Sequence, residues 1–375
     1  MYNILMATQS LGIGGIETHI VELCRGIKEK YKNINIVVCS NGGFYEKELE
    51  QINVKHIKVP LHNSNLKNIL KSYKMLKKII EEENINIVHA HTRVAAMICD
   101  SICKKKKISF YTTVHFDYDT KFPFNKLSKW GDKTLAVSKD LKEYVVKNYN
   151  VKDSNVYITV NGIDTNKFSK DVDYEDIINQ FNLNPNARRI VHISRLDDAT
   201  IKTLEILFDM TRELYEVIKN IEIVVVGDGT KFEYLKEKAN KINEEIGKNI
   251  IFMIGKRTYD INKFAASSTI GIGVSRSILE MMSCGKPVIL SGNQGYMGIF
   301  EKSKLELAYS TNFCFRGSNQ VSYIELKKDI LGIFDRDIED IDNMGKYNRQ
   351  VVLNYYSQEK MVEDYIKLWE ISDNS

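Results

Sequence analysis

The sequence has little of the features that mark membrane, secreted or fibrous proteins. Among its 375 residues are only four prolines, and no apolar run reaches the ~18 residues that a transmembrane helix requires. The N-terminus lacks the basic and long apolar segments of an export signal, so we expect a cytoplasmic protein. The six cysteines are scattered through apolar segments without a second close pair. This pattern argues against a disulfide or zinc framework and predicts reduced, buried thiols.

The remaining composition is that of an ordinary globular protein, but its charge is unevenly distributed. Hydrophobic residues make up 43% and charged residues 27%, which excludes a disordered chain. The net charge of +4 conceals a basic first part, because residues 1–160 hold 25 Lys and Arg against 16 Asp and Glu. A basic half favours an anionic partner, such as a phosphorylated lipid, a membrane face or an acidic glycan. Solvated, lysine-rich helix faces explain the same excess.

The segment Leu66–Glu83 is the clearest amphipathic helix of the basic half. Its apolar residues recur at the i, i+3, i+4, i+7 spacing, and we expect all of them to face the core. They are Leu66, Ile69, Leu70, Tyr73, Leu76, Ile79 and Ile80. The opposite side carries Lys67, Lys71, Lys74, Lys77 and Lys78. These lysines are the candidate contact with an anionic membrane.

Short β-branched runs alternate with longer amphipathic stretches along the whole chain. One series runs from Tyr2–Ala7 to Thr134–Val137, and a second runs from Arg189–Ser194 to Pro287–Ser291. Strands that alternate with helices form βαβ units, so we predict an α/β fold with two doubly wound, mainly parallel domains. The domains join near Asn161, in a turn-forming Asn-Gly-Ile-Asp cluster. Ligands are expected at the carboxyl ends of the strands, in the cleft between the domains.

A glycine-rich loop follows the first strand. Gly14 and Gly15 stand where this strand gives way to a helix, and glycines there let a phosphate or sugar approach the helix N-terminus. The residue order does not meet the dinucleotide-binding pattern G-x-G-x-x-G. A tight turn that requires positive φ at these glycines is the alternative explanation.

Basic residues follow the first strand of the second series. Ser194 and Arg195 end that strand, and Lys202 begins the next helix. Arginine as a forked donor and lysine as a point charge suit a diphosphate.

A second anion site is predicted further along the same series. A helix begins near Ser275 or Ser277, either of which can cap it, and its N-terminus favours an anion. Glu280, about one turn into this helix, can hold a ribose diol or simply compensate the helix dipole.

Histidines mark two strand ends of the first series. His115 follows Phe110–Val114 and can bind a sugar hydroxyl or transfer a proton, or be structural. His89 and His91 point the same way along a strand, so a metal pair is conceivable. We reject a metal site because no third ligand follows at a matching spacing.

Eight short motifs occur in an order that resembles one enzyme family. They are Gly14-Gly15-Ile16-Glu17-Thr18-His19, Ile87-Val88-His89-Ala90-His91, Thr112-Thr113-Val114-His115, Ala136-Val137-Ser138, Asn161-Gly162-Ile163-Asp164, Ser194-Arg195-Leu196, Val225-Val226-Gly227-Asp228-Gly229 and Leu279-Glu280-Met281-Met282 followed by Gly285-Lys286-Pro287. Together they resemble the retaining glycosyltransferases of family 4, which have the GT-B fold. The resemblance extends to the final helix.

The resemblance implies an architecture and a reaction. Two Rossmann-like domains would face each other across a cleft: residues 1–161 as the acceptor-binding domain and residues 162–356 as the nucleotide-sugar domain. The helix 357–375 would cross back to the first domain. The enzyme would move a sugar from a UDP- or GDP-linked donor, with retention of configuration and without a metal or other cofactor. The leaving diphosphate would take the acceptor proton and be stabilised electrostatically.

The resemblance also assigns roles to residues. Arg195 and Lys202 would neutralise the diphosphate, Glu280 would hold the ribose, and His115 would contact the donor sugar. The catalytic set is therefore His115, Arg195, Lys202 and Glu280. The donor-binding set is Gly14, Gly15, Ser194, Arg195, Lys202, Gly255, Ser275, Arg276, Ser277 and Glu280.

One departure from the family pattern concerns the donor. The first acid of the family's E-x7-E element should stand eight residues before Glu280, where this chain has Ile272. Such variants resemble bacterial surface-polysaccharide and spore-coat glycosyltransferases. We therefore expect a cell-envelope glycan or lipid-linked acceptor, reached at the inner membrane face through the basic first domain.

Two alternatives remain open from the sequence. A sugar-nucleotide 2-epimerase would use the same fold and would need Glu17, Asp117 or Asp119 as acid and base. A protein that has lost its donor acid at Ile272 would bind without catalysis and act as a scaffold. Nucleic acid is not an expected partner, because no recognition motif accompanies the lysines.

Overall fold

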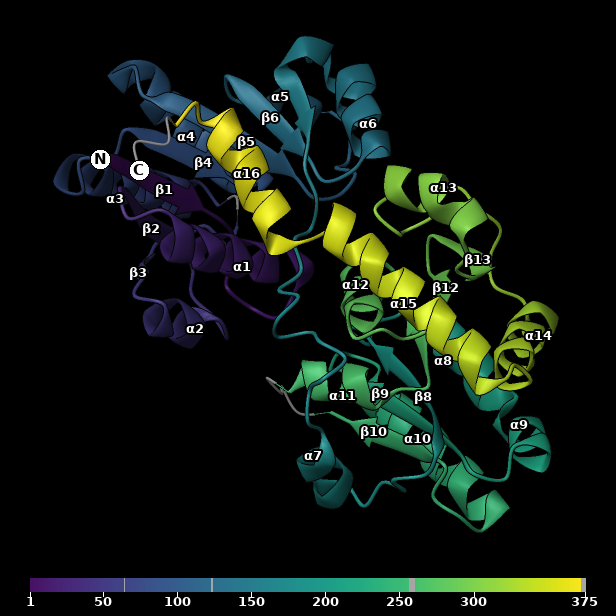
Figure 1. Cartoon of the computed structure of the whole chain (residues 1–375). Coiled ribbons are helices and arrows are strands. Elements are labelled where there is room, and N and C mark those ends of the chain that lie inside the picture. Colours follow the sequence, from purple (N-terminus) through teal and green to yellow (C-terminus); the bar gives the residue numbers. More distant parts are fainter. Residues whose placement is uncertain (64, 123, 256–259, 372–375) are drawn as a thin grey trace. The chain divides into compact units, whose positions relative to one another are not determined.

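The chain divides into two compact units in a computed structural model that describes residues 1–63, 65–122, 124–255 and 260–371. Unit 1 comprises Met1–Gly162 together with Gln358–Ser375, and unit 2 comprises Ile163–Ser357 (Figure 1). The chain therefore leaves unit 1 once and returns to it at the end. Among the described residues, no helix combines the length and the apolar character needed to cross a membrane.

The described part of unit 1 contains a sheet of seven parallel strands in the order β3-β2-β1-β4-β5-β6-β7. The strands are β1 (Tyr2–Ala7), β2 (Ile34–Ser40), β3 (Lys55–Lys58), β4 (Ile87–Ala90), β5 (Ser109–Val114), β6 (Lys133–Ala136) and β7 (Val156–Ile158). The helices are α1 (Gly15–Lys30), α2 (Glu46–Gln51), α3 (Leu66–Glu82), α4 (Arg93–Lys106), α5 (Phe124–Leu127), α6 (Lys139–Tyr149), the 3-10 turn η1 (Asp153–Asn155) and α16 (Gln358–Leu368).

The described part of unit 2 contains a sheet of six strands in the order β10-β9-β8-β11-β12-β13, parallel except for β13. The strands are β8 (Arg188–Ile193), β9 (Ile221–Val226), β10 (Ile251–Ile254), β11 (Ile270–Gly273), β12 (Val288–Gly292) and β13 (Gly295–Ile299). The helices are α7 (Glu175–Gln180), α8 (Lys202–Asp209), α9 (Thr211–Val217), α10 (Phe232–Ile246), α11 (Ile261–Ser267), α12 (Ser275–Ser283), the 3-10 turn η2 (Lys302–Lys304), α13 (Leu305–Ser310), α14 (Tyr323–Phe334) and α15 (Ile338–Tyr355).

Both sheets are apolar on both faces, because helices cover each side of a parallel sheet. All six residues of β9 are buried, and the central strand β1 is buried from Ile4 onward. The α/β prediction with two doubly wound domains is confirmed by this topology. The cysteines are free thiols, as predicted, and all are buried except the half-buried Cys314.

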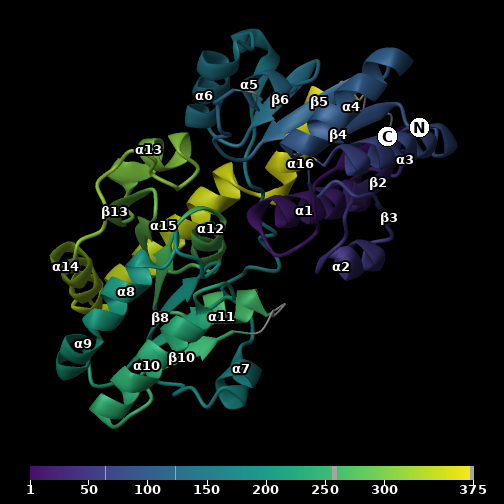
Figure 2. The same cartoon turned by 180° about the vertical axis from the view of Figure 1, so that it is seen from behind.

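Helix α16 completes unit 1 by packing against α1, and both views of the fold show it there (Figures 1 and 2). Glycine permits the close approach: a Cβ on Gly26 would lie 2.8 Å from a methyl group of Val362. A Cβ on Gly162 would meet the side chain of Met361 at the same distance. Any larger residue at either position would push the last helix away from unit 1.

The amphipathic helix α3 corrects one expectation. Leu76, Ile79 and Ile80 are buried as predicted, but Leu66 is 70% exposed and Leu70 is 55% exposed. The first turns of α3 extend beyond the sheet that its later turns cover. These two leucines therefore share an exposed surface with the neighbouring lysines.

Candidate functional site

The predicted site residues, except His115 after β5 and Gly255 after β10, follow strands at which a sheet reverses its strand order. In unit 1 the order reverses between β1 and β4, and in unit 2 it reverses between β8 and β11. At such a point the loops after two neighbouring strands run in opposite directions, so a crevice forms between them at the carboxyl edge of the sheet. This crevice is the usual ligand position in open α/β sheets. The glycine loop and His91 follow the two unit 1 strands. Arg195 and the start of α12 follow the two unit 2 strands.

The glycine loop of unit 1 is open to a ligand rather than forced by backbone strain. Gly14 has φ 179°, which is extended backbone, and Gly15 is not among the residues with positive φ. The alternative explanation of a tight turn with positive φ is therefore wrong. No atom lies within 4 Å of the place where a Cβ would stand on Gly15. The N-terminus of α1 is thus approachable beside Gly15, as a phosphate or sugar would require.

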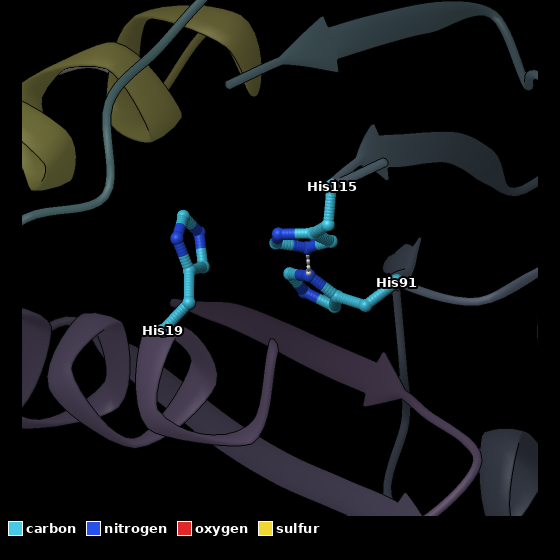
Figure 3. Close-up of side chains that lie close together, drawn as sticks. All are labelled: His19, His91 and His115. Atoms are coloured by element: carbon cyan, nitrogen blue, oxygen red, sulfur yellow. Dashed lines mark hydrogen bonds between the residues drawn. The ribbon is translucent and has the colours of Figure 1, made fainter. Parts of the chain in front are cut away.

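Four histidines of unit 1 lie next to one another at this sheet edge. His89 and His91 come from β4 and the residue after it, His115 follows β5, and His19 lies on α1. The rings of His89 and His91 stack at 4.9 Å, so the two side chains do point the same way. Figure 3 shows His91 and His115 joined by a hydrogen bond, with His19 facing them from the helix.

A series of hydrogen bonds runs through unit 1. It begins at Trp369, the residue after α16, and ends at Asn161, next to the last residue of the segment Met1–Gly162. The indole N–H of Trp369 donates to Nδ1 of His89 (3.0 Å), and Nε2 of His89 contacts the Thr113 hydroxyl (2.7 Å). That hydroxyl contacts Tyr365 (2.6 Å), whose hydroxyl contacts Nε2 of His19 (2.8 Å). Nδ1 of His19 then contacts Oδ1 of Asn161 (3.0 Å), which closes the series.

The direction of every bond in this series follows from its two ends. An indole N–H can only donate and an amide oxygen can only accept. Neutral His89 therefore carries its proton on Nε2, and neutral His19 carries its proton on Nδ1. It follows that Thr113 donates to Tyr365 and Tyr365 donates to His19. Every polar group of the series is satisfied without a charge.

Burial lowers the pKa values of three histidines of this edge, which favours their neutral forms. Desolvation lowers the pKa of His89 from 6.5 to about 3. It also lowers the pKa values of His91 and His115 well below 6.5, with a further lowering from the neighbouring histidines. A neutral imidazole can donate one hydrogen bond and accept another, but it supplies no positive charge to a phosphate.

The histidines lie close enough to raise the question of a metal site. One nitrogen from each of His19, His91 and His115 lies within 4.8 Å of the other two. The structure thus groups His91 with two histidines that no spacing in the sequence indicated, and His89 of the considered pair is not in this group. Both nitrogens of His19 already make hydrogen bonds, to Asn161 and Tyr365. An ion bound at His19 would have to displace one of them and break the series.

In unit 2, the loop after β8 places its basic residues at the surface. The Arg195 side chain is 69% exposed and forms an ion pair with Asp197 (3.0 Å). Lys202 is the first residue of α8 and is also exposed. The Ser194 hydroxyl forms a hydrogen bond with Nε2 of the buried His192 (2.9 Å). Both cations are therefore positioned to meet an anion from solvent.

Helix α12 begins at Ser275 but is not capped by either predicted serine. Ser275 has φ 55° and its N–H donates to the carbonyl of Phe313 (2.9 Å), so this amide is not open to a phosphate. The Ser277 hydroxyl donates to the carbonyl of Val274. The predicted cap is wrong because Val274 occupies the N-cap position, so both serines lie inside the helix.

Glu280 and Arg276 form a buried ion pair one turn apart on α12. Nε of Arg276 lies 2.9 Å from Oε1 of Glu280, and both residues are less than 9% exposed. Glu280 therefore orients the guanidinium of Arg276 in addition to any contact with a ligand. The sequence named both residues for the site but did not predict that they pair.

Three glycines after strands of unit 2, Gly227, Gly229 and Gly255, have packing roles. A Cβ on Gly227 would lie 1.9 Å from the carbonyl oxygen of Ser194, and one on Gly229 would lie 2.4 Å from that of Leu196. These glycines let the loops after β8 and β9 meet, as expected for a structural turn. A Cβ on Gly255, at the edge strand β10, would overlap the ring of Phe232. A larger residue at position 255 would therefore displace this ring.

The missing acid of the family pattern has a structural reason. Ile272 lies inside β11, is fully buried and belongs to the core of unit 2. Only Val274 separates β11 from α12. The position eight residues before Glu280 is therefore in a strand rather than in a loop, and a carboxylate there would be buried among apolar side chains.

The acids that an epimerase would need are dispersed. Glu17 accepts a hydrogen bond from the Ser10 hydroxyl (3.1 Å). Asp119 accepts from the backbone N–H of Lys121 (2.9 Å), and Asp117 is exposed in the same loop. Among the described residues, no hydrogen bond joins Asp117 to Asp119 as an acid and a base.

Two family models match the chain. The model of Glycosyltransferase Family 4 matches residues 13–167, and that of Glycosyl transferases group 1 matches residues 187–309. An uncharacterised glycosyltransferase of Methanocaldococcus jannaschii is 24% identical over 96% of this chain and 95% of its own length. The N-acetyl-alpha-D-glucosaminyl L-malate synthase of Bacillus anthracis is 22% identical over 77% of this chain and 76% of its own length.

Solved structures share the fold. A glycosyltransferase from Rickettsia africae superimposes with a TM-score of 0.77 at 20% identity, over 100% of this chain and 99% of that one. The Anabaena protein HepE, solved in complex with UDP and glucose, gives a TM-score of 0.76 at 17% identity, over 99% of this chain and 100% of that one. The chain is therefore similar to Glycosyltransferase Family 4 over residues 13–167 and to Glycosyl transferases group 1 over residues 187–309, and its two Rossmann-like domains have the GT-B fold.

Proposed function

We propose that this protein is a glycosyltransferase that moves a sugar from a nucleoside diphosphate sugar, with UDP as the first candidate nucleotide, to a cell-envelope glycan or lipid-linked acceptor with retention of configuration. The observation that carries the proposal is the position of Arg195, Lys202 and the start of α12 at one reversal point of the unit 2 sheet. The UDP bound to the similarly folded Anabaena protein supports the choice of nucleotide.

The chemistry of the step follows from what this edge offers. The glycosidic bond to the diphosphate breaks as the acceptor oxygen bonds to the sugar carbon on the same face, and the acceptor proton passes to the departing phosphate oxygen. Arg195 and Lys202 stabilise the charge that develops on the diphosphate. These side chains supply the positive charge, so the proposed reaction needs no metal ion.

Glu280 and Arg276 have linked roles in this proposal. The Glu280 carboxylate accepts hydrogen bonds from the ribose diol in this proposal, while its Oε1 holds Arg276. Arg276 is then directed at the nucleotide by a fixed partner rather than by its own flexible side chain. In unit 1, His115 keeps its proposed contact with the donor sugar.

The acceptor is proposed to lie in a membrane. The five lysines of α3 are all exposed and accompany the exposed Leu66 and Leu70. A cationic surface with apolar side chains among its lysines binds anionic lipid by charge and by partial burial of the apolar groups. Unit 1 would thereby work at the inner membrane face.

Calorimetric titration with UDP, GDP, ADP and CMP tests the donor site. We expect one nucleotide to bind selectively, without added metal and in the presence of EDTA. Arg195→Ala and Glu280→Gln should each weaken binding at least tenfold. Arg212→Ala is the matched control, because Arg212 is an exposed arginine of unit 2 whose partner is Glu245. Equal losses in the control, or no binding of any nucleotide, would overturn the proposal.

Product analysis separates the proposed transferase from its alternatives. Incubation of the matching nucleotide sugar with membrane extract should release the nucleoside diphosphate and place the sugar on an acceptor. An isomerised nucleotide sugar would indicate an epimerase. Nucleotide binding without any turnover would indicate the scaffold.

A further inference from the structure

The hydrogen bond between His91 and His115 links two histidines of different solvent exposure. His91 follows β4 and is fully buried, whereas His115 follows the neighbouring strand β5 and is partly exposed. Nδ1 of His91 lies 3.1 Å from Nε2 of His115, and Figure 3 shows the two rings facing each other through this bond. Both rings are neutral, so one proton lies between them and either ring can be its donor.

The other nitrogen of His91 decides which ring donates. Among the described residues, Nε2 of His91 is buried and has no hydrogen-bond partner. If His115 were the donor, His91 would carry its own proton on this nitrogen, and a buried N–H would be left unbonded. If His91 is the donor, Nε2 holds only a lone pair. Unbonded buried N–H groups are the rarer of the two cases.

We propose that His91 is a positioning residue that fixes His115 as the tautomer with its proton on Nδ1. Nε2 of His115 accepts the bond from His91, so Nδ1–H is the group that remains to meet a ligand. His115 then acts as a hydrogen-bond donor toward an oxygen atom, such as a hydroxyl of the sugar. It cannot serve as a base, because its one lone pair is already occupied. The ligand part of this inference rests on the proposed function, whereas the tautomer part does not.

Nitrogen NMR of protein labelled with ¹⁵N-histidine tests the tautomer directly. The ring-nitrogen signals of His115 are identified by their absence from the spectrum of His115→Gln. In the wild type, we expect these signals to show a protonated Nδ1 and an unprotonated Nε2. His91→Asn places an amide N–H near the position of Nδ1 and should preserve this pattern. His91→Gln, which reaches toward the Nε2 position instead, and His91→Leu should abolish it. A proton on Nε2 of His115 in the wild type would overturn the inference.

Donor turnover provides the functional test. With the nucleotide sugar identified by calorimetry, His91→Leu and His91→Gln should lower kcat about tenfold, the effect of one neutral hydrogen bond. His91→Asn should restore most of the loss, which a merely structural role would not predict. Unchanged kcat in a variant whose His115 tautomer has changed would overturn the donor role. If the wild type turns over no donor, the proposed function fails, and the NMR result still decides the tautomer.

Discussion

His89 illustrates at the scale of one residue how burial makes stability depend on pH. Its pKa is about 3 in the folded protein, against 6.5 for an unperturbed histidine. Between these values the unfolded chain binds a proton that the folded chain does not, so the free energy of unfolding falls as pH drops below about 6.5. The loss from this residue approaches about 1.4 kcal/mol per pH unit in the middle of the window.

Urea unfolding at several pH values can measure this effect in unit 1 alone. Both tryptophans of the chain, Trp130 and Trp369, belong to unit 1, so their fluorescence reports its unfolding. Between pH 6 and pH 4, His89→Gln should reduce the slope of the free energy of unfolding against pH by about 1.4 kcal/mol per pH unit, the contribution of one proton. Stability above pH 7 should not depend on pH in either protein through this residue. The same slope in both would contradict the assignment.

The hydroxyl of Tyr365 links two members of the hydrogen-bonded series, Thr113 and His19, so its removal breaks the series at two bonds. Tyr365→Phe removes the shared hydroxyl and leaves both Thr113 and His19 with a buried, unsatisfied atom. We expect unit 1 to lose about 2–4 kcal/mol, because each unsatisfied group costs about 1–3 kcal/mol. Tyr157→Phe, an exposed position of the same unit, should change stability by less than about 0.5 kcal/mol. Equal effects would show that the series contributes little.

These residues also show where reading the sequence reaches its limit. His115, Arg195 and the glycines were predicted at the sheet edge because strand ends can be recognised locally. Tyr365 and Trp369 were not predicted for the series, because more than 250 residues separate them from Thr113 and His89. Only the fold brings such partners together. His19 had a local signal in its glycine motif but no indication of its partners.

Helix α3 is the element whose surface leads to a testable membrane contact. Replacing Lys67, Lys71 and Lys74 by Gln should weaken sedimentation with anionic vesicles about a hundredfold, at about 1 kcal/mol per lysine near the surface. Replacing three exposed lysines of unit 2, Lys236 and Lys241 of α10 and Lys248 just after it, is the matched control. Equal losses would mean that net charge, rather than this surface, governs binding.

Hydrophobic periodicity predicted that α3 is a helix, but it did not predict which of its apolar residues the rest of unit 1 buries. Leu66 and Leu70 continue the same spacing as Leu76 and Ile80, and only the position of the sheet leaves the first pair exposed. The same limit applies to β11, where the motif spacing located position 272 but not the strand that contains it. Element type follows from local pattern, whereas coverage depends on neighbours.

At the scale of the whole molecule, the return of the chain to unit 1 allows the units to be separated by truncation. A protein that ends at Ser357 keeps all of unit 2 and loses α16 from unit 1. It should still bind the donor nucleotide through the residues of unit 2, weakened only by the loss of the Gly14-Gly15 loop, while Trp130 fluorescence shows unit 1 unfolding at much lower urea. A chain that ends at Ile371 serves as control. Loss of nucleotide binding in the shorter chain would place donor residues outside unit 2.

The late arrival of α16 has a consequence for synthesis on the ribosome. Unit 1 begins the chain, yet its last helix is translated after all of unit 2. Domains usually fold as they emerge, at about 5–20 residues per second. Here the first unit must wait with the apolar surface around Gly26 uncovered, so unit 2 should reach its native state first. The first domain to be translated would therefore be the last to finish folding, and during that interval it is the natural client of a chaperone.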